Sequence, residues 1–404
     1  NMTKSVLKFL ITPNYATPYD QRMVNGLADG LNAIGHQALA LSSPISSREV
    51  VNQCKEYSVD MVLQVNRTRS QDVELPKNTR YISWYQDVFP ETVKGFAANF
   101  HDSDILYALG DPGVLGFHAP MPCYVGSLVS GVDQNIFNHK KQNGHEKIDF
   151  SMCGFIPAPP RTRGLFEIML ETVEQYYQPL NGSLDIHELE SVIRENMAPY
   201  PNAFSIVKQK LLKQLYKMRQ LFKPDDGTNR HLLSPFERSI SFYTREYPRL
   251  LDRVALINKV LKVSDSLELY GPGWERHKKF RSYSKGVVSN QEDLLNIYCK
   301  SRINLANNTH GLGLHSRTFE CMAVGGFIFT HESPHDDKPG GMLTSFEPDK
   351  HFGLFNPDNI HEEAERWLGD NKQRLEAGKQ ASKIVREQHC WHHRARQICD
   401  DLRK

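Results

Sequence analysis

The sequence has no long hydrophobic run, no excess of charge of one sign and no paired cysteine pattern. No apolar stretch approaches the roughly 20 residues of a membrane helix, so we expect at most peripheral membrane contact. The net charge of the 404 residues is +2, which provides no overall field to attract nucleic acid. The seven cysteines are scattered and odd in number, which favours a reducing compartment. We therefore predict a cytoplasmic protein with no nucleic-acid partner.

The spacing typical of metal sites is also missing. The groups at 331–337 and 389–393 contain histidine, acidic and cysteine side chains, but neither has the paired spacing of a zinc site. Asp102-Ser103-Asp104 has the form of an Asp-x-Asp metal motif, which is expected to follow a strand. Here it precedes the strand predicted at 105–109, so a helix end is the better interpretation. We predict no metal and no bound cofactor.

In the first part of the chain, short apolar segments alternate with helical ones. The predicted strands are 5–12, 37–41, 59–65, 81–84, 105–109 and 124–126. Such alternation indicates a parallel, doubly wound sheet of the α/β class. We assign residues 1–138 to an N-terminal Rossmann-like domain and the polar residues 139–147 to a linker.

A second α/β unit follows the linker. Its predicted strands are 148–153, 267–270, 303–305 and 327–330. A helical insertion of about 164–235 interrupts it, and the tail has helical periodicity at 361–367 and 372–402. Residues 148–404 are therefore predicted to form a C-terminal Rossmann-like domain with a helical insertion.

The most informative segment runs from a glycine-rich loop into a short helix. A phosphate is bound by backbone N–H groups at a helix start and by a cation that can donate to two oxygens. Gly311 and Gly313 permit the first, and Arg317 provides the second. Glu320, three residues after Arg317, can face the same ligand, and a carboxylate suits a sugar diol such as a ribose. The alternative is a helix cap with an internal Arg–Glu ion pair.

The segment resembles the donor-binding motif of GT-B glycosyltransferases, in the variant of the CgeB-like spore-maturation group. The matching residues are Leu314, Arg317, Phe319, Glu320, Ala323, Gly325 and Gly326. His315 stands where that group usually has asparagine, and Leu312 occupies the first position of the glutamate pair found in retaining enzymes. Further similarity lies at 84–87, 131–137, 270–274 and 385–396.

The resemblance implies two Rossmann-like domains that face each other across a cleft. A nucleotide-sugar donor would bind the C-terminal domain, and a glycan, lipid-linked or protein acceptor would bind the N-terminal one. The donor-binding residues would be Gly271, Gly273, Gly313, His315, Ser316, Arg317, Glu320 and Arg161. Transfer would need no metal, because arginine can meet the leaving diphosphate.

An inverting enzyme of this kind needs a base in the N-terminal domain. Asp87, after the predicted strand 81–84, is the preferred candidate, and Asp20 and His118 are alternatives. Each of them is also a residue type common in turns and caps.

Three other functions stay open from the sequence. One is a transferase with a CMP-linked donor of the Kdo type, and the second is a nucleotide-sugar epimerase on the same fold. The third is a nucleotide-sugar-binding module without catalysis. The donor, the acceptor and the stereochemical outcome are not determined by these motifs.

Overall fold

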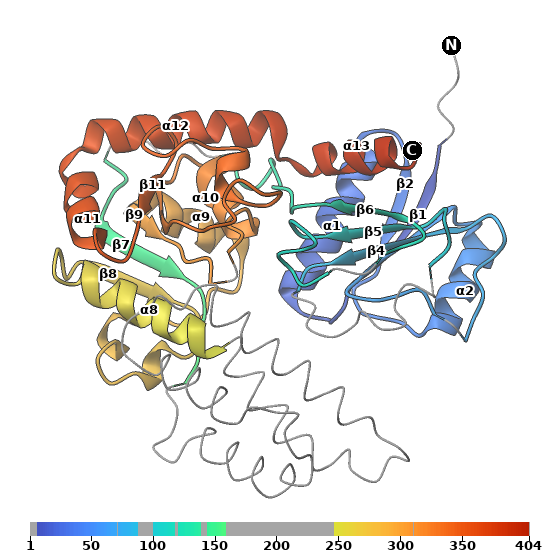
Figure 1. The fold of residues 1–404 in the computed structure, drawn as a ribbon, viewed down its shortest axis with the longest axis horizontal. Helices are drawn as coiled ribbons and strands as arrows, with labels where there is room; N and C mark the ends of the chain where they lie inside the picture. The colour runs from blue at the N-terminus through green and yellow to red at the C-terminus, as the bar shows by residue number, and fades with distance from the viewer. Residues whose placement is uncertain are drawn as a thin grey trace, which may run out of the picture.

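The computed structural model describes residues 6–70, 72–87, 100–117, 120–138, 144–158, 246–309 and 311–403. They form two sheets, each made of parallel strands, and the two sheets lie next to each other in one elongated molecule (Figure 1). The predicted insertion of about 164–235 falls outside the described residues.

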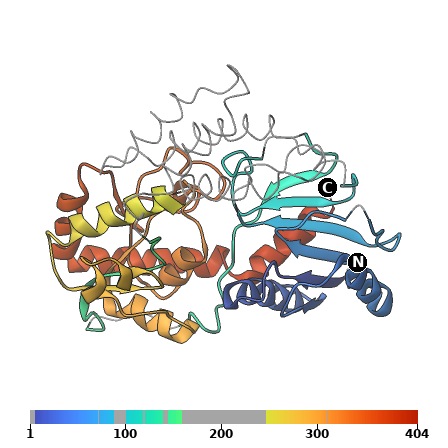
Figure 2. The ribbon, with the colours of Figure 1, turned by 90° about the horizontal axis from the view of Figure 1, so that it is seen from below.

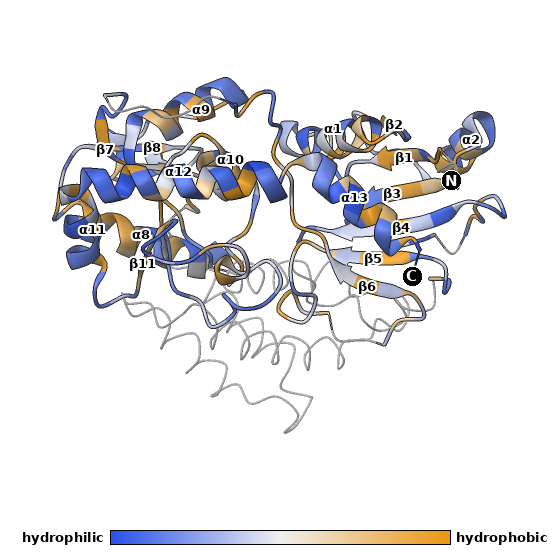
Figure 3. Ribbon diagram, turned by 90° about the horizontal axis from the view of Figure 1, so that it is seen from above, coloured by the Kyte–Doolittle hydropathy of each residue, from blue (hydrophilic) through white to orange (hydrophobic). Residues whose placement is uncertain are grey.

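The first sheet has six parallel strands in the order β2-β1-β3-β4-β5-β6. These strands are β1 (Lys8–Thr12), β2 (Gln37–Ala40), β3 (Met61–Val65), β4 (Arg80–Tyr85), β5 (Ile105–Ala108) and β6 (Tyr124–Ser127). β3 and β5 are buried along their whole length, as expected for strands covered on both faces. Figure 3 shows β1, β3 and β5 mainly in apolar colours.

Helix α1 (Pro18–Ala33) connects β1 to β2, and α2 (Ser47–Tyr57) connects β2 to β3. Thr17 caps α1 by accepting a hydrogen bond from the backbone N–H of Asp20, and proline follows it at the first turn. Ser46 and Glu49 form a capping box on α2. Local sequence signals therefore set where both helices begin.

The second sheet has five parallel strands in the order β11-β10-β9-β7-β8. They are β7 (Ile148–Cys153), β8 (Leu267–Tyr270), β9 (Ser301–Leu305), β10 (Ile328–His331) and β11 (Gly353–Phe355). The helices are α8 (Tyr247–Val260), α9 (Gln291–Lys300), α10 (Ser316–Ala323), α11 (Ile360–Gly369) and α12 (Asn371–Gln388). These two doubly wound sheets confirm the predicted fold of two Rossmann-like domains.

The last helix, α13 (Trp391–Asp401), crosses back to the first sheet, as Figures 1 and 2 show. Trp391, Ala395 and Ile398 join the core formed by α1 and the first sheet. On α1, a Cβ added at Gly30 would lie 2.5 Å from the backbone oxygen of Trp391, so glycine is required for this close contact. The predicted C-terminal domain of 148–404 included α13, whereas its packing places it with the first sheet.

The tail predicted to be helical over 372–402 is two helices with a break at His389 and Cys390. The chain first passes from the first domain to the second after Val132, which lies beside this break. Val132 donates its backbone N–H to the oxygen of His389 at 2.9 Å. The two crossings therefore lie side by side and connect the domains at one place.

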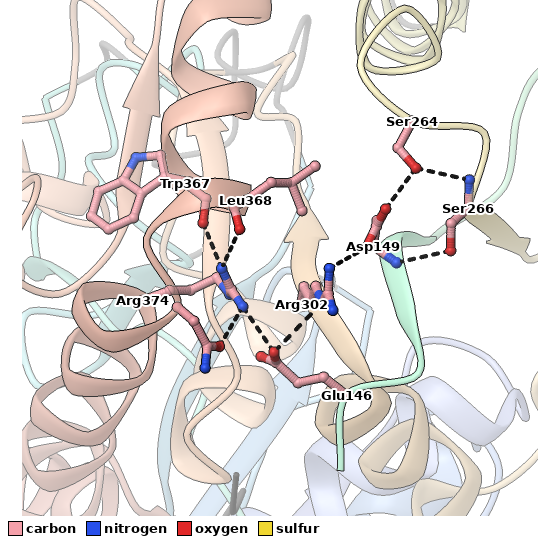
Figure 4. A network of polar contacts seen from close by, with 9 residues as sticks. Glu146, Asp149, Ser264, Ser266, Arg302, Trp367, Leu368 and Arg374 are labelled. Atoms are coloured by element: carbon pink, nitrogen blue, oxygen red, sulfur yellow. Dashed lines mark hydrogen bonds and ion pairs between the residues drawn. The ribbon is translucent and has the colours of Figure 1, made fainter. Parts of the chain in front are cut away.

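A network of charged side chains fixes the start of β7 to α12 (Figure 4). Arg374, which is 1% exposed, donates to Glu146 at 2.8 Å and to the backbone oxygen of Trp367 at 2.5 Å. Arg302 lies 3.8 Å from the same Glu146 carboxylate and 3.0 Å from that of Asp149. Both terminal nitrogens of Arg374 have partners, one of them a carboxylate, whereas its buried Nε has no hydrogen-bond partner among the described residues.

Candidate active site

A pocket lies at the carboxyl ends of β7 and β9. In open α/β sheets, ligands bind at this edge. The residues that line it are Ser151, Met152, Cys153, Arg253, Tyr298, Asn304, Leu305, Ala306, Asn307, His315, Arg317, Thr318 and Ile328. Two of them, His315 and Arg317, were predicted from the sequence as donor-binding residues. We call this the basic pocket.

Two arginines converge on the turn that follows β7. Arg317, in the first turn of α10, donates to the backbone oxygen of Cys153 at 2.6 Å. Arg253, on α8, donates through Nε to Asn307 at 2.8 Å. A Cβ added at Gly154 would lie 2.7 Å from Nη1 of Arg317 and 3.0 Å from Nη1 of Arg253. The absence of a side chain at Gly154 therefore lets both guanidinium groups reach the turn.

A third arginine, Arg249, precedes Arg253 by one turn of α8. The guanidinium of Arg249 lies 4.7 Å from the ring centre of Phe155, and that of Arg253 lies 5.4 Å from it. Sequence reasoning missed both α8 arginines. Their spacing of four residues, which places them on one helix face, is the signal that it could have used.

The charge of this cluster is compensated only in part, by Glu246, whose Oε1 lies 3.2 Å from Nη1 of Arg249. Burial lowers the pKa of Arg253 well below its usual range, and Arg317 and Arg249 lower it further. Nη1 of Arg253 is buried and has no hydrogen-bond partner among the described residues. Burial also raises the pKa of neighbouring Asp252 well above its usual range, which favours its neutral form. A buried, partly unpaired guanidinium cluster provides the conditions for binding an anion.

His315 adds a neutral donor to the basic pocket. It occupies the position before α10 but makes no side-chain capping bond there. Burial lowers its pKa to about 3, with further contributions from Arg317 and Arg253. At neutral pH the imidazole is therefore uncharged and keeps one N–H to donate.

A second pocket lies between the domains, and we call it the interdomain pocket. Its lining residues are Tyr19, Arg22, Met23, Asn25, Gly26, Asp29, Gly131, Asp133, Gln291, Ser316, Glu320 and Trp391. Ser316 and Glu320 come from α10, which also carries Arg317. The short helix α10 therefore contributes to both pockets.

Glu320 is 5% exposed, and burial raises its pKa to about 7, whereas Arg22 and Arg317 act to lower it. Nη1 of Arg22, on α1, lies 3.6 Å from Oε1 of Glu320. The residue predicted to bind a ribose thus contacts the other domain. The alternative interpretation, an Arg–Glu ion pair internal to the helix, is not found among the described residues, because the arginine that pairs with Glu320 is Arg22 of α1.

Tyr19 lies where charges from both domains meet. Burial raises the pKa of its hydroxyl to about 12, Arg317 lowers it, and Asp87 and Glu320 raise it further. Although 39% of Tyr19 is exposed, its hydroxyl end is within electrostatic reach of all three charges. Asp87 also acts on Arg249. The structure therefore brings Asp87 to the side of the cleft that faces the arginines.

The remaining predicted residues lie elsewhere or are not described. The carboxylate of Asp20 accepts from Thr17 and from the backbone of Tyr15, at 3.4 Å, in the first turn of α1. His118 and Arg161 lie outside the described residues.

The predicted donor-binding glycines serve close packing and do not line the basic pocket. A Cβ at Gly271 would lie 2.5 Å from the oxygen of Gly154, and one at Gly273 would lie 2.1 Å from that of Ile156. Gly313 leaves room for Met342, whose Cγ would lie 2.5 Å from an added Cβ. Glycine at 271 and 273 thus lets the loop after β8 pack on the turn that holds the arginines.

The Asp-x-Asp segment has a structural role. Asp104 is 1% exposed and accepts two hydrogen bonds from Arg69, at 2.9 and 3.1 Å. Within the described part of the chain, Cys390, His392 and His393 could together hold a metal ion, since their ligand atoms lie within 4.8 Å of one another. This group sits at the start of α13, where His393 also accepts from the backbone N–H of Cys390 at 3.1 Å. The absence of a metal from the reaction stays a prediction.

Among the residues that the structure describes, no helix is both long and apolar enough to cross a membrane.

Comparison with known proteins gives similarity to glycosyltransferases. No curated protein matches the chain. A glycosyltransferase from Rickettsia africae ESF-5 has 12% identity and a TM-score of 0.49, over 99% of this chain and 98% of that one. WaaG, a glycosyltransferase of lipopolysaccharide biosynthesis, has 12% identity and a TM-score of 0.49, over 98% and 99%. Anabaena HepE in complex with UDP and glucose has 10% identity and a TM-score of 0.48, over 98% and 100%.

The match to a family model covers the part of the chain that contains α8 and α10. Residues 245–400 match the family described as "Glycosyl transferase-like". This range includes Arg249, Arg253, Arg317 and Glu320. The second domain, with the basic pocket at its sheet edge, is therefore similar to glycosyl transferase-like proteins.

Proposed function

We propose that this protein is a glycosyltransferase that moves a sugar from a nucleoside-diphosphate sugar to a hydroxyl group of an acceptor. The observation that carries the proposal is the convergence of Arg249, Arg253 and Arg317 at the carboxyl edge of the second sheet. One buried nitrogen of Arg253 has no partner among the described residues. The family match over residues 245–400 supports the same conclusion. Membership of the CgeB-like group is part of this proposal and rests on the motif around Arg317.

In the proposed reaction, the bond between the sugar carbon and the diphosphate oxygen breaks as the acceptor oxygen forms a new bond to that carbon. Arg317, Arg253 and Arg249 take up the charge that develops on the leaving diphosphate, and His315 donates one more hydrogen bond. Three fixed positive charges supply the role that a divalent cation has in metal-dependent transferases. Turnover should therefore survive EDTA, and activity that disappears with EDTA and returns with manganese would contradict this view.

Glu320 would accept hydrogen bonds from the ribose diol of the donor. Its carboxylate lies at the boundary of the interdomain pocket, on the same helix as Arg317. Binding would require the ribose to replace Arg22 as the partner of Glu320, or to share the carboxylate with it. Glu320→Gln should weaken the binding of UDP more than that of inorganic pyrophosphate. Equal losses for both ligands would contradict the ribose role.

Asp87 is the proposed base. It follows β4 at the carboxyl ends of the strands of the first sheet, and it acts electrostatically on Tyr19 of the same domain and on Arg249 of the other domain. The proton of the acceptor hydroxyl would pass to this carboxylate as the sugar bond forms. Asp87→Asn should lower kcat by roughly 10²-fold while the affinity for UDP or GDP stays at the wild-type value.

The first test is the binding of nucleotides. UDP, GDP, CMP and inorganic pyrophosphate are titrated against the protein in a thermal-shift assay, because a ligand of the native state raises the melting temperature. Arg317→Ala should weaken binding of the stabilising nucleoside diphosphate by about 1.5–3 kcal/mol. The matched control is Arg276→Ala, whose side chain is 64% exposed and pairs with Glu275 away from the basic pocket. Unchanged affinity in folded Arg317→Ala would contradict the phosphate role.

A further inference from the structure

Asn66 has an unusual backbone conformation at the edge where Asp87 lies. It is the first residue after β3, and its φ angle of 52° is in the left-handed region. Most side chains avoid that region, although asparagine tolerates it better than others. Non-glycine residues held in such conformations cluster at functional sites. The left-handed conformation of Asn66 therefore has to be explained by the contacts that this residue makes.

The hydrogen bonds of Asn66 to described residues reach the end of β4. Its backbone N–H donates to the oxygen of Trp84 at 3.0 Å. Its side-chain oxygen accepts from the backbone N–H of Gln86 at 2.7 Å, and its Nδ2 donates to Oδ2 of Asp87 at 2.7 Å. One amide thus holds both the backbone before Asp87 and one oxygen of its carboxylate.

This arrangement leaves the other carboxylate oxygen for chemistry. Oδ1 of Asp87 has no hydrogen bond to the residues that the structure describes, and the side chain is exposed. Because Nδ2 of Asn66 holds Oδ2, the rotation of the carboxylate is restricted and Oδ1 has a defined direction. Catalytic groups need this kind of support, since a displacement of about 1 Å can cost about 10²-fold in rate.

We propose that Asn66 is the positioning residue of the base, and that its amide orients the Asp87 carboxylate toward the acceptor hydroxyl. The proposal rests on the proposed function, in which Asp87 accepts the acceptor's proton. Asn66 itself touches neither substrate. Its left-handed backbone is what directs its side chain from the end of β3 to the neighbouring strand β4.

Two substitutions separate the amide from the backbone. Asn66→Gly keeps the left-handed conformation, which glycine adopts freely, and removes both side-chain hydrogen bonds. Asn66→Asp keeps the acceptor for the N–H of Gln86 but places a like charge beside Asp87. The matched control is Ser58→Gly, because Ser58 also has a positive φ, 49°, at the end of α2 and outside the two pockets.

The rate test uses the nucleotide sugar, among UDP-, GDP- and CMP-linked sugars, from which the wild type releases nucleotide. Asn66→Gly should lower kcat about 10-fold, with the KM for the nucleotide sugar and the melting temperature near wild type. Asn66→Asp should be at least as slow, and Ser58→Gly should be as active as wild type. In the Asp87→Asn background, Asn66→Gly should cause no further loss, because the two residues act as one unit. A further loss, or wild-type kcat in Asn66→Gly, overturns the proposal.

These experiments also separate the role of Asn66 from the proposed glycosyltransferase function. If Asp87→Asn has the wild-type kcat, Asp87 is not the base and Asn66 has no base to position. The binding of UDP or GDP to Arg317→Ala tests the donor site alone and does not depend on Asn66. A crystal structure of Asn66→Gly decides the point without any substrate. The Asp87 carboxylate should leave its wild-type position, and a carboxylate that stays within about 0.5 Å of it overturns the proposal.

Discussion

Two buried arginines of the second domain, Arg374 and Arg253, differ in what surrounds them. Arg374 pairs with Glu146 at 2.8 Å and donates to backbone oxygens, so both of its terminal nitrogens are occupied (Figure 4). Arg253 donates through Nε to Asn307, while its Nη1 has no partner among the described residues. The two side chains have similar burial, 1% and 4% exposed.

The difference distinguishes a charge that holds the fold from a charge that is kept for a ligand. A buried ion pair is costly to break, because the removal of one partner leaves the other charge alone. A buried guanidinium with repelling neighbours already destabilises the fold, and an anion would relieve that cost. Under the proposed function, the same residue type serves stability in one place and binding in the other.

The largest effect is expected at Arg374. Arg374→Met should lower the free energy of unfolding by about 3–5 kcal/mol, because it leaves Glu146 buried without its main partner. Urea denaturation monitored by fluorescence measures this loss. The double variant Arg374→Met with Glu146→Gln should recover part of it. A loss below about 1 kcal/mol in the single variant would remove the distinction between the two arginines.

The opposite pattern is expected at Arg253. Arg253→Met should leave the free energy of unfolding unchanged or raise it, because it removes a buried, poorly compensated charge. It should weaken binding of a nucleoside diphosphate by about 1.5–3 kcal/mol, which isothermal titration calorimetry with UDP and GDP measures. A variant that is destabilised as strongly as Arg374→Met, with unchanged nucleotide affinity, would make Arg253 a structural residue.

Glu320 gives the smallest effect and a pH dependence with a definite sign. Its pKa rises from 4.5 to about 7 on folding, so the folded state holds the proton more tightly than the unfolded state. Its contribution to stability is therefore full below pH 4.5 and is lost as the pH rises toward 7.

Glu320→Gln should remove this dependence and stabilise the protein at pH 8 by roughly 1–3 kcal/mol relative to wild type. Thermal melts of both proteins from pH 5 to pH 8 test the sign. If the difference between the two melting temperatures does not change over that range, Glu320 is not a strained carboxylate. UDP binding at pH 8 then shows whether the strain is tied to donor binding.

Much of the fold follows from the sequence because its signals are local. Apolar segments predict the strands of both sheets except β11, and caps at Thr17 and Ser46 set where α1 and α2 begin. The break at Cys390 was missed, since the helical periodicity of the tail continues through it. The glycines of α1 that receive α13 carry no local signal for that contact.

The site could be predicted only in part, for the same reason. Arg317, Glu320 and His315 lie in one motif, and Asp87 follows a strand whose end was predicted. Arg249 and Arg253 lie more than 60 residues before Arg317. A sequence of one chain gives no sign that Arg253 and Arg317 meet at Gly154, or that Arg249 lies over Phe155.

The sequence by itself determined the two parallel sheets and the motif on α10, because periodicity and capping act over a few residues. Only the tertiary structure decided that three arginines share the turn after β7, that Arg22 reaches Glu320 from the other domain, and that Asn66 holds Asp87. These contacts depend on the register of neighbouring strands and on the chain crossing twice between the domains. Burial then sets the charges, since the pKa of Glu320 and of His315 is shifted first by loss of water.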